Sequence, residues 1–365
     1  MKVMTIFGTR PEIIRLSVVL RVLDERCDHI TVHTGQNHHE SLSDIFIRDL
    51  RVRTPDVHLG IRSSSFGDQA GQIIAKTDTV MAEHNPDKVL ILGDTNSALS
   101  AFVAARRGIP VFHMEAGNRC YDDRVPEEIN RRIIDHSSTI LLPYTERSKE
   151  NLVREGIGRE RIFVTGNPIN EVLNEFEEEI EGSDILEKND LTASEYFLAT
   201  IHRAENVDVE GRLRMIFEGL TACVKKFDKP LIISVHPRTA EKIERFGIKL
   251  DSERIRVLDP LGFFDFVKLE KNAAAVLTDS GTVQEECCIF GVPNVTVRDV
   301  TERPETVECG SNIISGAVPD AIVRSLALAL EQPTDWTPPA EYLAKNVART
   351  VSKIVLGHTS VKQYV

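Results

Sequence analysis

The chain has 365 residues, of which 41% are hydrophobic and 27% are charged, and its net charge is −12. This length is about twice that of a usual domain, so two domains with separate cores are expected, and the hydrophobic content excludes a disordered chain. The negative charge argues against a nucleic-acid or membrane-surface binder, and no apolar run approaches the roughly 20 residues of a membrane span.

The N-terminal half has the pattern of strands that alternate with helices. Short apolar runs predict strands over residues 2–7, 29–34, 88–92, 111–114 and 139–142. Helices are expected at about 11–24, 97–107, 127–137 and 146–155. Alternation of this kind predicts a parallel sheet covered by helices.

A run of acidic residues follows this half. Residues 171–190 contain nine acidic side chains and one lysine, so they carry −8 of the net charge. Such runs are usually solvated faces or linkers, and we interpret this one as a boundary rather than a binding preference. We assign residues 1–172 to a first domain and 190–349 to a second, with a C-terminal helix at about 350–365 that packs back on the first.

The second half repeats the alternation. Its expected strands are 196–201, 230–235, 256–258, 274–278 and 294–297. Its expected helices are at about 212–226, 264–271, 282–290 and 319–331. Ligands of open parallel sheets bind at the carboxyl ends of the strands, so the loops that follow the strands are where a site is expected.

Three connections of the first half each offer a carboxylate. Asp94 and Glu115 follow strands, and Glu127 opens a helix. A helix cap explains Asp94, and the helix dipole favours Glu127, so neither residue is convincing alone. Three carboxylates at one sheet edge are less easily explained by capping and helix dipoles alone, so they indicate a functional site. Arg10 adds a cation beside a helix N-terminus, where an ordinary surface arginine is the alternative.

The second half supplies the complementary groups. Histidines and arginines occur in its loops at His202, His236, Arg238 and Arg303. Ser280 and Gly281, at a helix start, can present backbone N–H groups to a phosphate, although capping alone also explains Ser280. The two halves together therefore indicate a site for a sugar phosphate or a nucleotide.

Several common motifs are missing. The sequence has no GxGxxG, which weakens a dinucleotide interpretation, and no GxxxxGK[ST], which disfavours a P-loop. Without HExxH or a Cys/His cluster, no metal-ligand set is expected. The adjacent His38 and His39 point different ways, which disfavours joint ligation. Six cysteines without CxxC spacing fit a reducing cytoplasm.

The assembled loops resemble the non-hydrolysing UDP-N-acetylglucosamine 2-epimerases, in the family's order and spacing. The matching segments are 8–12, 35–36, 93–95, 113–117, 126–131, 166–168, 202–206, 279–281, 285–286 and 302–305. The resemblance implies an α/β fold of the GT-B type, with two Rossmann-like, doubly wound parallel-sheet domains and the active site in the cleft between them. It also implies a homodimer, a UDP-linked N-acetylamino sugar as substrate, and no cofactor.

The resemblance assigns roles to single residues as well. The implied catalytic residues are Asp94, Glu115, Glu127 and His202. The implied substrate-binding and UDP-binding residues are Arg10, Arg15, Gln36, Arg131, His236, Arg238, Phe266, Ser280, Gly281, Thr282, Glu286 and Arg303. Phe266 is expected near the uracil, and Glu286 is expected to hold ribose hydroxyls.

The match departs from the family pattern in three places. Arg15 stands where the family has a lysine, Thr282 stands where it has a second glycine, and the segment between Glu115 and Glu127 is shorter. This shorter segment, with residues 236–239 and 260–263, is similar to a sub-branch that converts UDP-2-acetamido-2,6-dideoxy-L-talose to UDP-N-acetyl-L-fucosamine for surface polysaccharides. UDP-N-acetylglucosamine and UDP-N-acetylmannosamine remain the other candidate substrates.

The implied reaction inverts C2 by anti elimination of UDP to a 2-acetamidoglycal, followed by re-addition. Carboxylates suit the positive charge that develops at C1, while Arg10, His202 and the N–H groups of 280–281 suit the departing diphosphate. Which carboxylate is acid and which is base stays open. A glycosyltransferase of the same fold, a hydrolysing 2-epimerase and a non-enzymatic UDP-sugar sensor remain alternatives.

Overall fold

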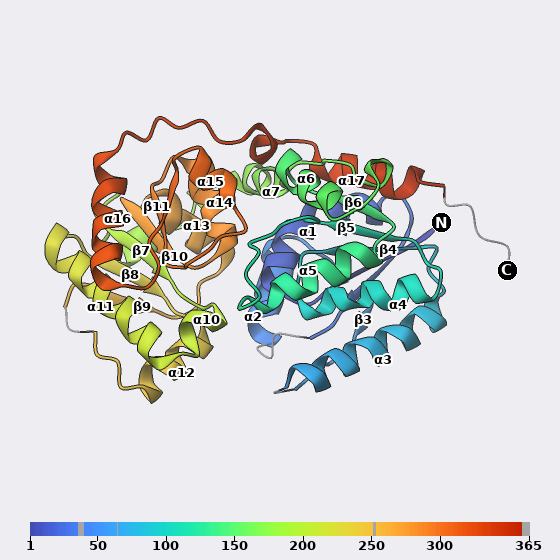
Figure 1. Cartoon of the computed structure of the whole chain (residues 1–365), viewed down its shortest axis with the longest axis horizontal. Helices are drawn as coiled ribbons and strands as arrows, with labels where there is room; N and C mark the ends of the chain where they lie inside the picture. The colour runs from blue at the N-terminus through green and yellow to red at the C-terminus, as the bar shows by residue number, and fades with distance from the viewer. Residues whose placement is uncertain (36–39, 64, 251–252, 360–365) are drawn as a thin grey trace. The chain divides into compact units, whose positions relative to one another are not determined.

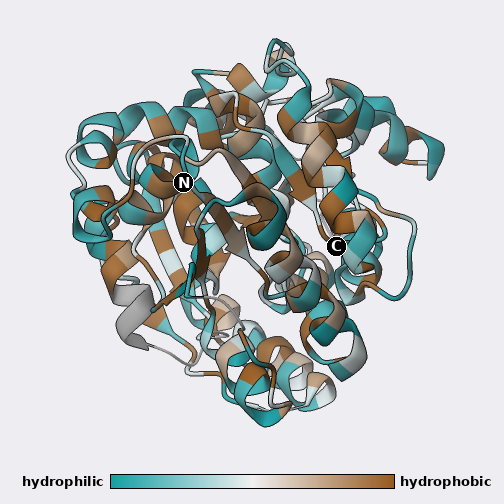
Figure 2. Ribbon diagram, turned by 90° about the vertical axis from the view of Figure 1, so that its left-hand side faces the viewer, coloured by the Kyte–Doolittle hydropathy of each residue, from teal (hydrophilic) through white to brown (hydrophobic). Residues whose placement is uncertain are grey.

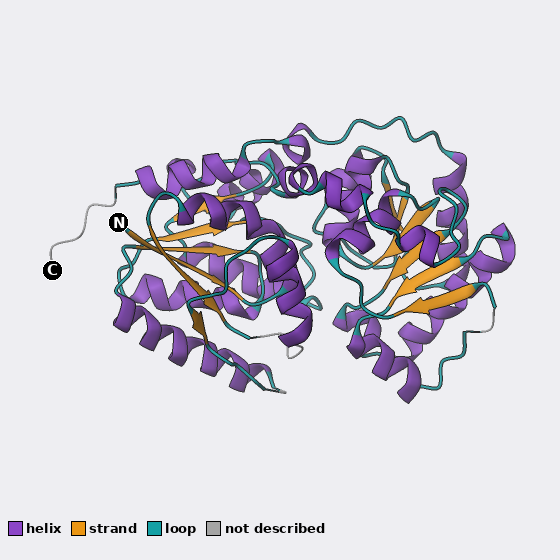
Figure 3. Ribbon diagram, turned by 180° about the vertical axis from the view of Figure 1, so that it is seen from behind, coloured by secondary structure: helices purple, strands orange, loops and turns teal. Residues whose placement is uncertain are grey.

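The computed structural model describes residues 1–35, 40–63, 65–250 and 253–359. The chain forms two compact units: unit 1 comprises Met1–Glu175 and Ala340–Val365, and unit 2 comprises Phe176–Pro339. Each unit is built on a parallel sheet of six strands, which Figure 3 shows in orange between helices in purple. In the part of the chain that the structure describes, no helix has the length and apolar character needed to cross a membrane.

The sheet of unit 1 has the strand order β3-β2-β1-β4-β5-β6. Its strands are β1 (Lys2–Phe7), β2 (Asp28–His33), β3 (Val57–His58), β4 (Lys88–Leu92), β5 (Val111–Met114) and β6 (Ile140–Leu142). All neighbouring strands are parallel. Every residue of β4 and β5 is buried, since helices cover both faces of a parallel sheet, and this explains why these strands are continuous apolar runs.

The helices of unit 1 connect these strands. They are α1 (Arg10–Asp24), α2 (Glu40–Asp49), α3 (Phe66–His84), α4 (Ser100–Arg106), α5 (Pro126–Ser137), α6 (Glu146–Arg154), α7 (Ile169–Glu175) and α17 (Val347–Gly357). Short 3₁₀ turns occur at Asn96–Leu99, Arg159–Arg161 and Ala340–Leu343. Helices α3, α4 and α5 pack in succession, while α7 and α17 pack against α1. Figure 1 shows α17, in red, joined to the blue and green elements of this unit.

The sheet of unit 2 has the order β12-β11-β10-β7-β8-β9. Its strands are β7 (Phe197–Thr200), β8 (Leu231–Ser234), β9 (Ile255–Leu258), β10 (Ala275–Thr278), β11 (Asn294–Thr296) and β12 (Asn312–Ile314). Its helices are α8 (Glu177–Glu181), α9 (Ile185–Lys188), α10 (Ala204–Val207), α11 (Glu210–Phe227), α12 (Pro237–Arg245), α13 (Phe263–Lys271), α14 (Gly281–Phe290), α15 (Pro304–Glu308) and α16 (Pro319–Glu331).

The two sheets have the same topology. In each, the first strand of the unit lies beside the fourth, and later strands are added outward on both sides. This is the doubly wound order of Rossmann-like domains, in which the chain reverses direction across the sheet between the first and fourth strands. The reversal point lies between β1 and β4 in unit 1 and between β7 and β10 in unit 2, and ligands of such sheets bind there.

The cores consist of strand side chains packed against one side of each helix. In unit 1, Met4, Ile6 and Ile91 belong to a buried cluster with residues of α3 and α4, and in unit 2 Phe197 and Leu277 belong to a cluster with residues of α11 and α16. Figure 2 shows helices with brown hydrophobic residues along one side and teal hydrophilic residues along the other. This amphipathic pattern is what the period of 3.6 residues requires.

The structure contains elements that the sequence analysis did not predict. These are α2, α3, α10, α12, α15, β3 and β12, together with the helices α7 to α9. Helix α3 had a usable signal, because its buried residues Ile73, Thr77, Val80 and Met81 recur at helical spacing. The acidic run forms three short helices, α7 to α9, with apolar side chains such as Val172 buried, so it is a solvated helical face and not an extended linker.

Helix α17 is attached to the sheet of unit 1 through a buried lysine. Lys88 of β4 is 4% exposed, and its ammonium group donates to the carbonyl oxygens of Val355, Leu356 and His358 at 2.5, 3.3 and 2.6 Å. These carbonyls belong to the end of α17, where the last turn has no intrahelical donors. Burial lowers the pKa of Lys88 below its ordinary value.

We expect Lys88→Met to destabilise unit 1 by about 2 kcal/mol, because three helix-end carbonyls lose a charged donor while the apolar stem is kept. Urea unfolding measures the loss, and hydrogen exchange should show faster exchange across Val347–Gly357. Lys353→Met, at an exposed position of the same helix, is the matched control. Equal effects of the two substitutions would contradict this role of Lys88.

Candidate functional site

Glu12 connects the two loops at the reversal point of unit 1. It is the third residue of α1, and its carboxylate accepts hydrogen bonds from the backbone N–H groups of Gly8 and Thr9 at 2.9 and 2.7 Å. The hydroxyl of Thr95, in the loop after β4, donates to its other oxygen at 2.9 Å. Thr9 and Glu12 form a capping box, which fixes the start of α1. The loops after β1 and β4 are thereby held side by side.

The approach of these loops leaves no room for a side chain at Gly8. A Cβ atom there would lie 1.9 Å from Oγ1 of Thr34 and 2.4 Å from Oγ of Ser97. These two hydroxyls are themselves hydrogen-bonded at 2.7 Å. The glycine is therefore required by the close contact of three strand-end loops.

Asp94 pairs with Arg131, and a second carboxylate, that of Glu128, fixes the position of this arginine. Its Oδ2 lies 2.8 Å from both Nε and Nη2 of Arg131, and Nη1 of Arg131 donates to Glu128 at 2.7 Å. Glu128 also accepts from the backbone N–H groups of Cys120 and Tyr121. Burial alone would raise the pKa of Glu128, but these N–H groups and the Arg131 charge lower it below its ordinary value. Arg131 therefore sits between two carboxylates in a fixed position.

Glu115 forms a second carboxylate–arginine pair at the carboxyl ends of the unit 1 strands. Nη1 of Arg15 lies 2.8 Å from its Oε2, and both side chains are at most 9% exposed. The Arg15 guanidinium also lies over the ring of Tyr144, 5.6 Å from its centroid. A planar guanidinium can stack on a ring and pair with a carboxylate at the same time. A lysine ammonium makes this combination of contacts less well.

The backbone at Glu115 is unusual. The residue follows β5 directly and has a φ of +66°, in the left-handed region that costs a non-glycine residue energy. Its N–H remains bonded to the carbonyl oxygen of Leu142 at 3.1 Å, and Asn118 donates to its Oε1 at 3.2 Å. Such conformations concentrate at functional sites, where the surrounding structure holds them in place.

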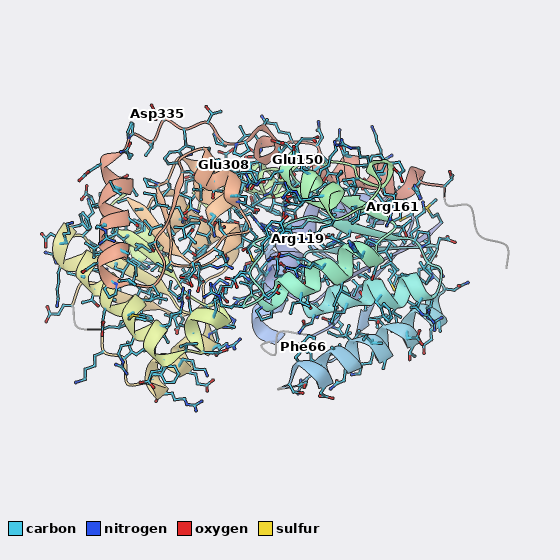
Figure 4. The ribbon with its side chains drawn as sticks, viewed as in Figure 1. Phe66, Arg119, Glu150, Arg161, Glu308 and Asp335 are labelled. Atoms are coloured by element: carbon cyan, nitrogen blue, oxygen red, sulfur yellow. The ribbon has the colours of Figure 1, made fainter. Side chains whose placement is uncertain are left out.

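A buried ion network supports the loop that carries Glu115. The ring nitrogens of His113 lie 2.8 Å from Asp135 of α5 and 2.8 Å from the carbonyl oxygen of Gly93. Arg119, labelled in Figure 4, lies 2.8 Å from Asp135 and 2.6 Å from Glu155. Although burial would raise the pKa of Asp135, His113 and Arg119 lower it. The network joins β5, α5 and the end of α6.

The remaining expected residues of unit 1 lie near these pairs in sequence. Glu127 is in the first turn of α5, one residue before Glu128, and is partly exposed. Arg10 is the first residue of α1, with its guanidinium 5.7 Å from the ring centroid of Phe46, and burial lowers its pKa. Gln36 lies outside the described residues.

Asp279 connects the loops at the reversal point of unit 2, as Glu12 does in unit 1. It is fully buried at the end of β10, and it accepts from the backbone N–H groups of His202 and Arg203 at 3.0 and 2.9 Å. The amide of Asn206 donates to it at 3.0 Å, and Nδ1 of His202 lies 3.3 Å away. The carboxylate of Asp279 therefore binds the neighbouring loop, which carries His202 and Arg203.

The N-terminus of α14 lies at this reversal point. Ser280 is the residue before the helix, and its hydroxyl is 2.9 Å from that of Thr282. A Cβ at Gly281 would lie 3.0 Å from Oε1 of Glu302, so glycine lets the helix start close to the loop after β11. Glu302 is held in turn by Arg203 and by the buried Arg298, at 3.0 and 2.8 Å.

The second turn of α14 carries buried carboxylates. Glu285 is fully buried and pairs with Nε of Arg303, the residue that precedes α15. Glu286 is 5% exposed. Phe266, in α13, is half-buried against the apolar cluster that includes Val283 of α14. The structure thus brings Arg303 and Phe266 to the helix that carries Ser280, Gly281 and Glu286.

His236 and Arg238 lie at the start of α12, after β8. Nδ1 of His236 accepts from the backbone N–H of Arg238 at 3.3 Å, so the histidine caps the helix. The guanidinium of Arg238 is exposed and pairs with Asp208. Both residues follow β8, the strand next to β7 in the sheet.

Several important residues were not singled out from the sequence. Glu12 had a signal, since Thr9 and Glu12 have the spacing of a capping box. Glu128 had a weaker signal in its spacing of three from Arg131. Tyr144 and Asp135 had none, because their contacts join segments that are distant in sequence.

Comparisons with known proteins agree on one family. The family model described as UDP-N-acetylglucosamine 2-epimerase matches residues 21–356. A UDP-N-acetylglucosamine 2-epimerase of Methanocaldococcus jannaschii is 41% identical over 353 residues, 93% of this chain and 95% of the relative. A UDP-2,3-diacetamido-2,3-dideoxy-D-glucuronate 2-epimerase of Pseudomonas aeruginosa is 38% identical, over 90% of this chain and 92% of that protein.

Solved structures give the same result. The crystal structure of the M. jannaschii UDP-GlcNAc 2-epimerase in complex with UDP-GlcNAc and UDP has a TM-score of 0.94 and 39% identity, and the match covers 98% of this chain and 100% of that one. The glycosyltransferase WaaG has a TM-score of 0.61 at 13% identity, covering 98% of this chain and 100% of that one, which shows a shared fold alone.

Glu12 generates a prediction about pH. Burial is the largest influence on its carboxyl and raises its pKa from 4.5 to about 7, against the opposing hydrogen bonds. Between these values the folded state binds more protons than the unfolded state, so stability falls as the pH rises, by about 3 kcal/mol in total. Glu12→Gln should remove this decline in urea-unfolding free energy measured between pH 4.5 and pH 8.

Glu83→Gln, at an exposed position of α3, controls for the loss of one acidic group. A Glu12→Gln variant whose unfolding free energy falls with pH as steeply as that of the wild type would contradict the raised pKa of Glu12.

Proposed function

Because this chain belongs to the UDP-N-acetylglucosamine 2-epimerase family, we propose that it inverts C2 of a UDP-linked N-acetylhexosamine by the non-hydrolysing route. The chain is an isomerase with two α/β domains of the GT-B type. The observation that carries the mechanism is the pair of arginine-held carboxylates, Asp94 and Glu115, at the carboxyl edge of the unit 1 sheet.

The reaction needs a way to remove an unactivated proton. In the elimination the C2–H and C1–O bonds break, a C1=C2 double bond forms, and UDP leaves with the C1–O electron pair. The enzyme holds the proton, UDP then adds back to C1, and a proton is delivered to the opposite face of C2. Separate groups must therefore take and give the proton, and general acid–base groups contribute roughly 10²–10⁴-fold each.

We assign a catalytic role to each carboxylate from the residues that contact it and from its exposure. An arginine at 2.8 Å favours the ionised form of a carboxylate, so Asp94 and Glu115 suit the stabilisation of positive charge at C1 and the removal of the C2 proton. Glu127 lies at the partly exposed start of α5, and we assign it to proton delivery. His202, whose backbone Asp279 fixes, is the further catalytic residue.

UDP is the proposed ligand of unit 2. The first turn of α14 presents backbone N–H groups and the positive end of the helix dipole, which suit a diphosphate. In this proposal Glu286 holds the ribose hydroxyls and Phe266 contacts the uracil. The remaining substrate and UDP contacts are proposed for Arg10, Arg15, Gln36, Arg131, His236, Arg238, Ser280, Gly281, Thr282 and Arg303.

The identity of the sugar is a more specific proposal than the type of reaction. The M. jannaschii relative is named for UDP-N-acetylglucosamine and the P. aeruginosa relative for a diacetamido uronate, and both names contain a 2-acetamido sugar. We propose either the UDP-N-acetylglucosamine and UDP-N-acetylmannosamine pair or, from the variant segments, UDP-2-acetamido-2,6-dideoxy-L-talose. We also propose a role in making surface-polysaccharide precursors in a reducing cytoplasm, which the six free thiols fit.

We further propose that the protein is a homodimer. Phe102 of α4 and Ile129 and Ile133 of α5 are 46%, 49% and 44% exposed. The two isoleucines are four residues apart and so share one face of α5, and α4 packs against α5. Grouped apolar side chains at a surface are typical of an interface, and a second copy of the chain is the occupant we propose.

Turnover in D₂O tests the proposed reaction. Incubation with UDP-N-acetylglucosamine, and separately with UDP-2-acetamido-2,6-dideoxy-L-talose, should place deuterium at C2 of the recovered UDP-sugar of the true substrate, detected by NMR. Both UDP-sugars returned without label would overturn the proposal. Consumption only with an added acceptor would indicate a glycosyltransferase, and accumulation of free sugar with UDP would indicate a hydrolysing epimerase.

The same assay on Asp94→Asn and Glu115→Gln separates an enzyme from a sensor. We expect each variant to lose at least about 100-fold in turnover. UDP binding should persist in both variants, because the proposed contacts to the uracil, the ribose and the N–H groups of α14 lie in unit 2. An unchanged rate of label incorporation would remove these carboxylates from the mechanism.

The double variant Ile129→Glu/Ile133→Glu should elute as a monomer, because four charges at a two-fold interface oppose burial. Light scattering after size exclusion gives the mass. Leu328→Glu, 49% exposed on α16 of unit 2, should leave the dimer intact. A wild-type protein with the mass of one chain would contradict the proposed homodimer.

A further inference from the structure

Two cysteine thiols meet between the end of α14 and the residue that follows α15. Cys288 lies in the last turn of α14 and is fully buried, whereas Cys309 directly follows α15 and is partly exposed. Their sulfur atoms are 3.6 Å apart, in the weak hydrogen bond that one thiol donates to another. The proposed mechanism uses neither residue.

The adjacent Cys287 faces a different neighbour. Consecutive helix residues point in directions about 100° apart, so two adjacent cysteines of α14 cannot share one partner. The thiol of Cys287 donates to Glu270 of α13 at 3.2 Å, whereas that of Cys288 faces Cys309. The thiol pair therefore joins two segments that are 21 residues apart in the sequence.

Both ends of α15 contact α14. Arg303, the residue before α15, pairs through its Nε with Glu285 of α14. Cys309, the residue after α15, contacts Cys288, which lies three residues beyond Glu285 and so shares its side of α14. A change in the distance between the two sulfurs therefore acts on the short helix that begins at Arg303.

The surroundings of the two thiols give them different roles in an oxidation. Thiolates are the form that reacts with peroxides, and a charged sulfur is tolerated better at the partly exposed Cys309 than at the buried Cys288. The hydrogen bond from the Cys288 thiol lowers the pKa of Cys309 below its ordinary value, and the same bond raises the pKa of Cys288. The thiolate thus lies where solvent reaches it, with a second thiol in contact.

We propose that hydrogen peroxide oxidises Cys288 and Cys309 to a disulfide, which joins α14 to the end of α15 and weakens the binding of UDP. The Cys309 thiolate attacks one oxygen of the peroxide, an S–O bond forms, the O–O bond breaks and hydroxide leaves. The sulfur of Cys288 then attacks that of Cys309, an S–S bond replaces the S–O bond, and water leaves with the Cys288 proton. Peroxide gains the two electrons that the sulfurs lose, and a dithiol restores both thiols by exchange.

The effect on UDP rests on the proposed function, in which Arg303 contacts UDP. The sulfurs of a disulfide are about 2.05 Å apart, so closing the pair from 3.6 Å draws them together by about 1.5 Å. Because α15 has only five residues, a shift at Cys309 also moves Arg303 relative to Ser280 and Gly281 at the start of α14. Loss of one charge-assisted contact weakens binding by about tenfold.

Thiol mapping tests the disulfide. The reduced protein is treated with hydrogen peroxide, the remaining free thiols are alkylated, and the peptides are identified by mass spectrometry. We expect a linked pair of peptides that contain Cys288 and Cys309, which dithiothreitol separates. If both residues stay alkylated after peroxide, or if Cys309 is oxidised without becoming linked to Cys288, the proposal is overturned.

Isothermal titration with UDP tests the effect on binding. Peroxide-treated wild type should bind UDP about tenfold more weakly than reduced wild type, and dithiothreitol should restore the Kd. Cys309→Ser should bind UDP as reduced wild type does, both before and after peroxide. Cys27→Ser, which removes a partly exposed thiol of unit 1, is the matched control and should respond to peroxide as the wild type does.

Three outcomes of the titration would contradict the proposal. Formation of the disulfide without a change in Kd would remove its effect on UDP, and an equal loss of affinity in peroxide-treated Cys309→Ser would assign the loss to another residue. Reduced wild type that binds no UDP would overturn the proposed function and the effect on UDP together. Normal binding by the reduced protein that peroxide does not weaken overturns this inference alone.

Discussion

In each unit a buried carboxylate binds together the two loops at the reversal point of the sheet. Glu12 does this in unit 1 through Gly8, Thr9 and Thr95, and Asp279 does it in unit 2 through the N–H groups that begin the His202 loop. Strand-end N–H groups have no partner in the sheet and must be satisfied by other groups. One carboxylate can accept several such bonds, and the loops that these two carboxylates hold carry Arg10 and Asp94 in unit 1 and His202 in unit 2.

The site of unit 1 depends further on arginines that fix carboxylates. Arg131 lies between Asp94 and Glu128, and Arg15 lies between Glu115 and the ring of Tyr144. Breaking such a buried pair leaves an uncompensated charge, so each arginine constrains its carboxylate strongly. The arginine at position 15 combines an ion pair with Glu115 and a stacking contact with Tyr144.

The fold and the function are separable in this protein. The same two-domain fold occurs in a glycosyltransferase at 13% identity, so the fold alone does not select the reaction. The family match is what identifies the reaction type, and the carboxylate–arginine pairs place charged groups after β4 and β5. Within unit 2, the fully buried Glu285 pairs with Arg303, a residue proposed to bind the nucleotide.

The sequence alone determined the alternation of strands and helices and the loops that carry charged residues. Buried parallel strands are continuous apolar runs, and a polar residue after such a run is visible in one dimension. Helix α3 was missed although its pattern was present, whereas the short strand β12 gave little pattern to find. Only the tertiary structure decided that Asp279 binds a loop about 75 residues away and that Arg15 meets Glu115. These contacts join segments that packing brings together, and the partner of a buried charge is set by that packing and not by local sequence.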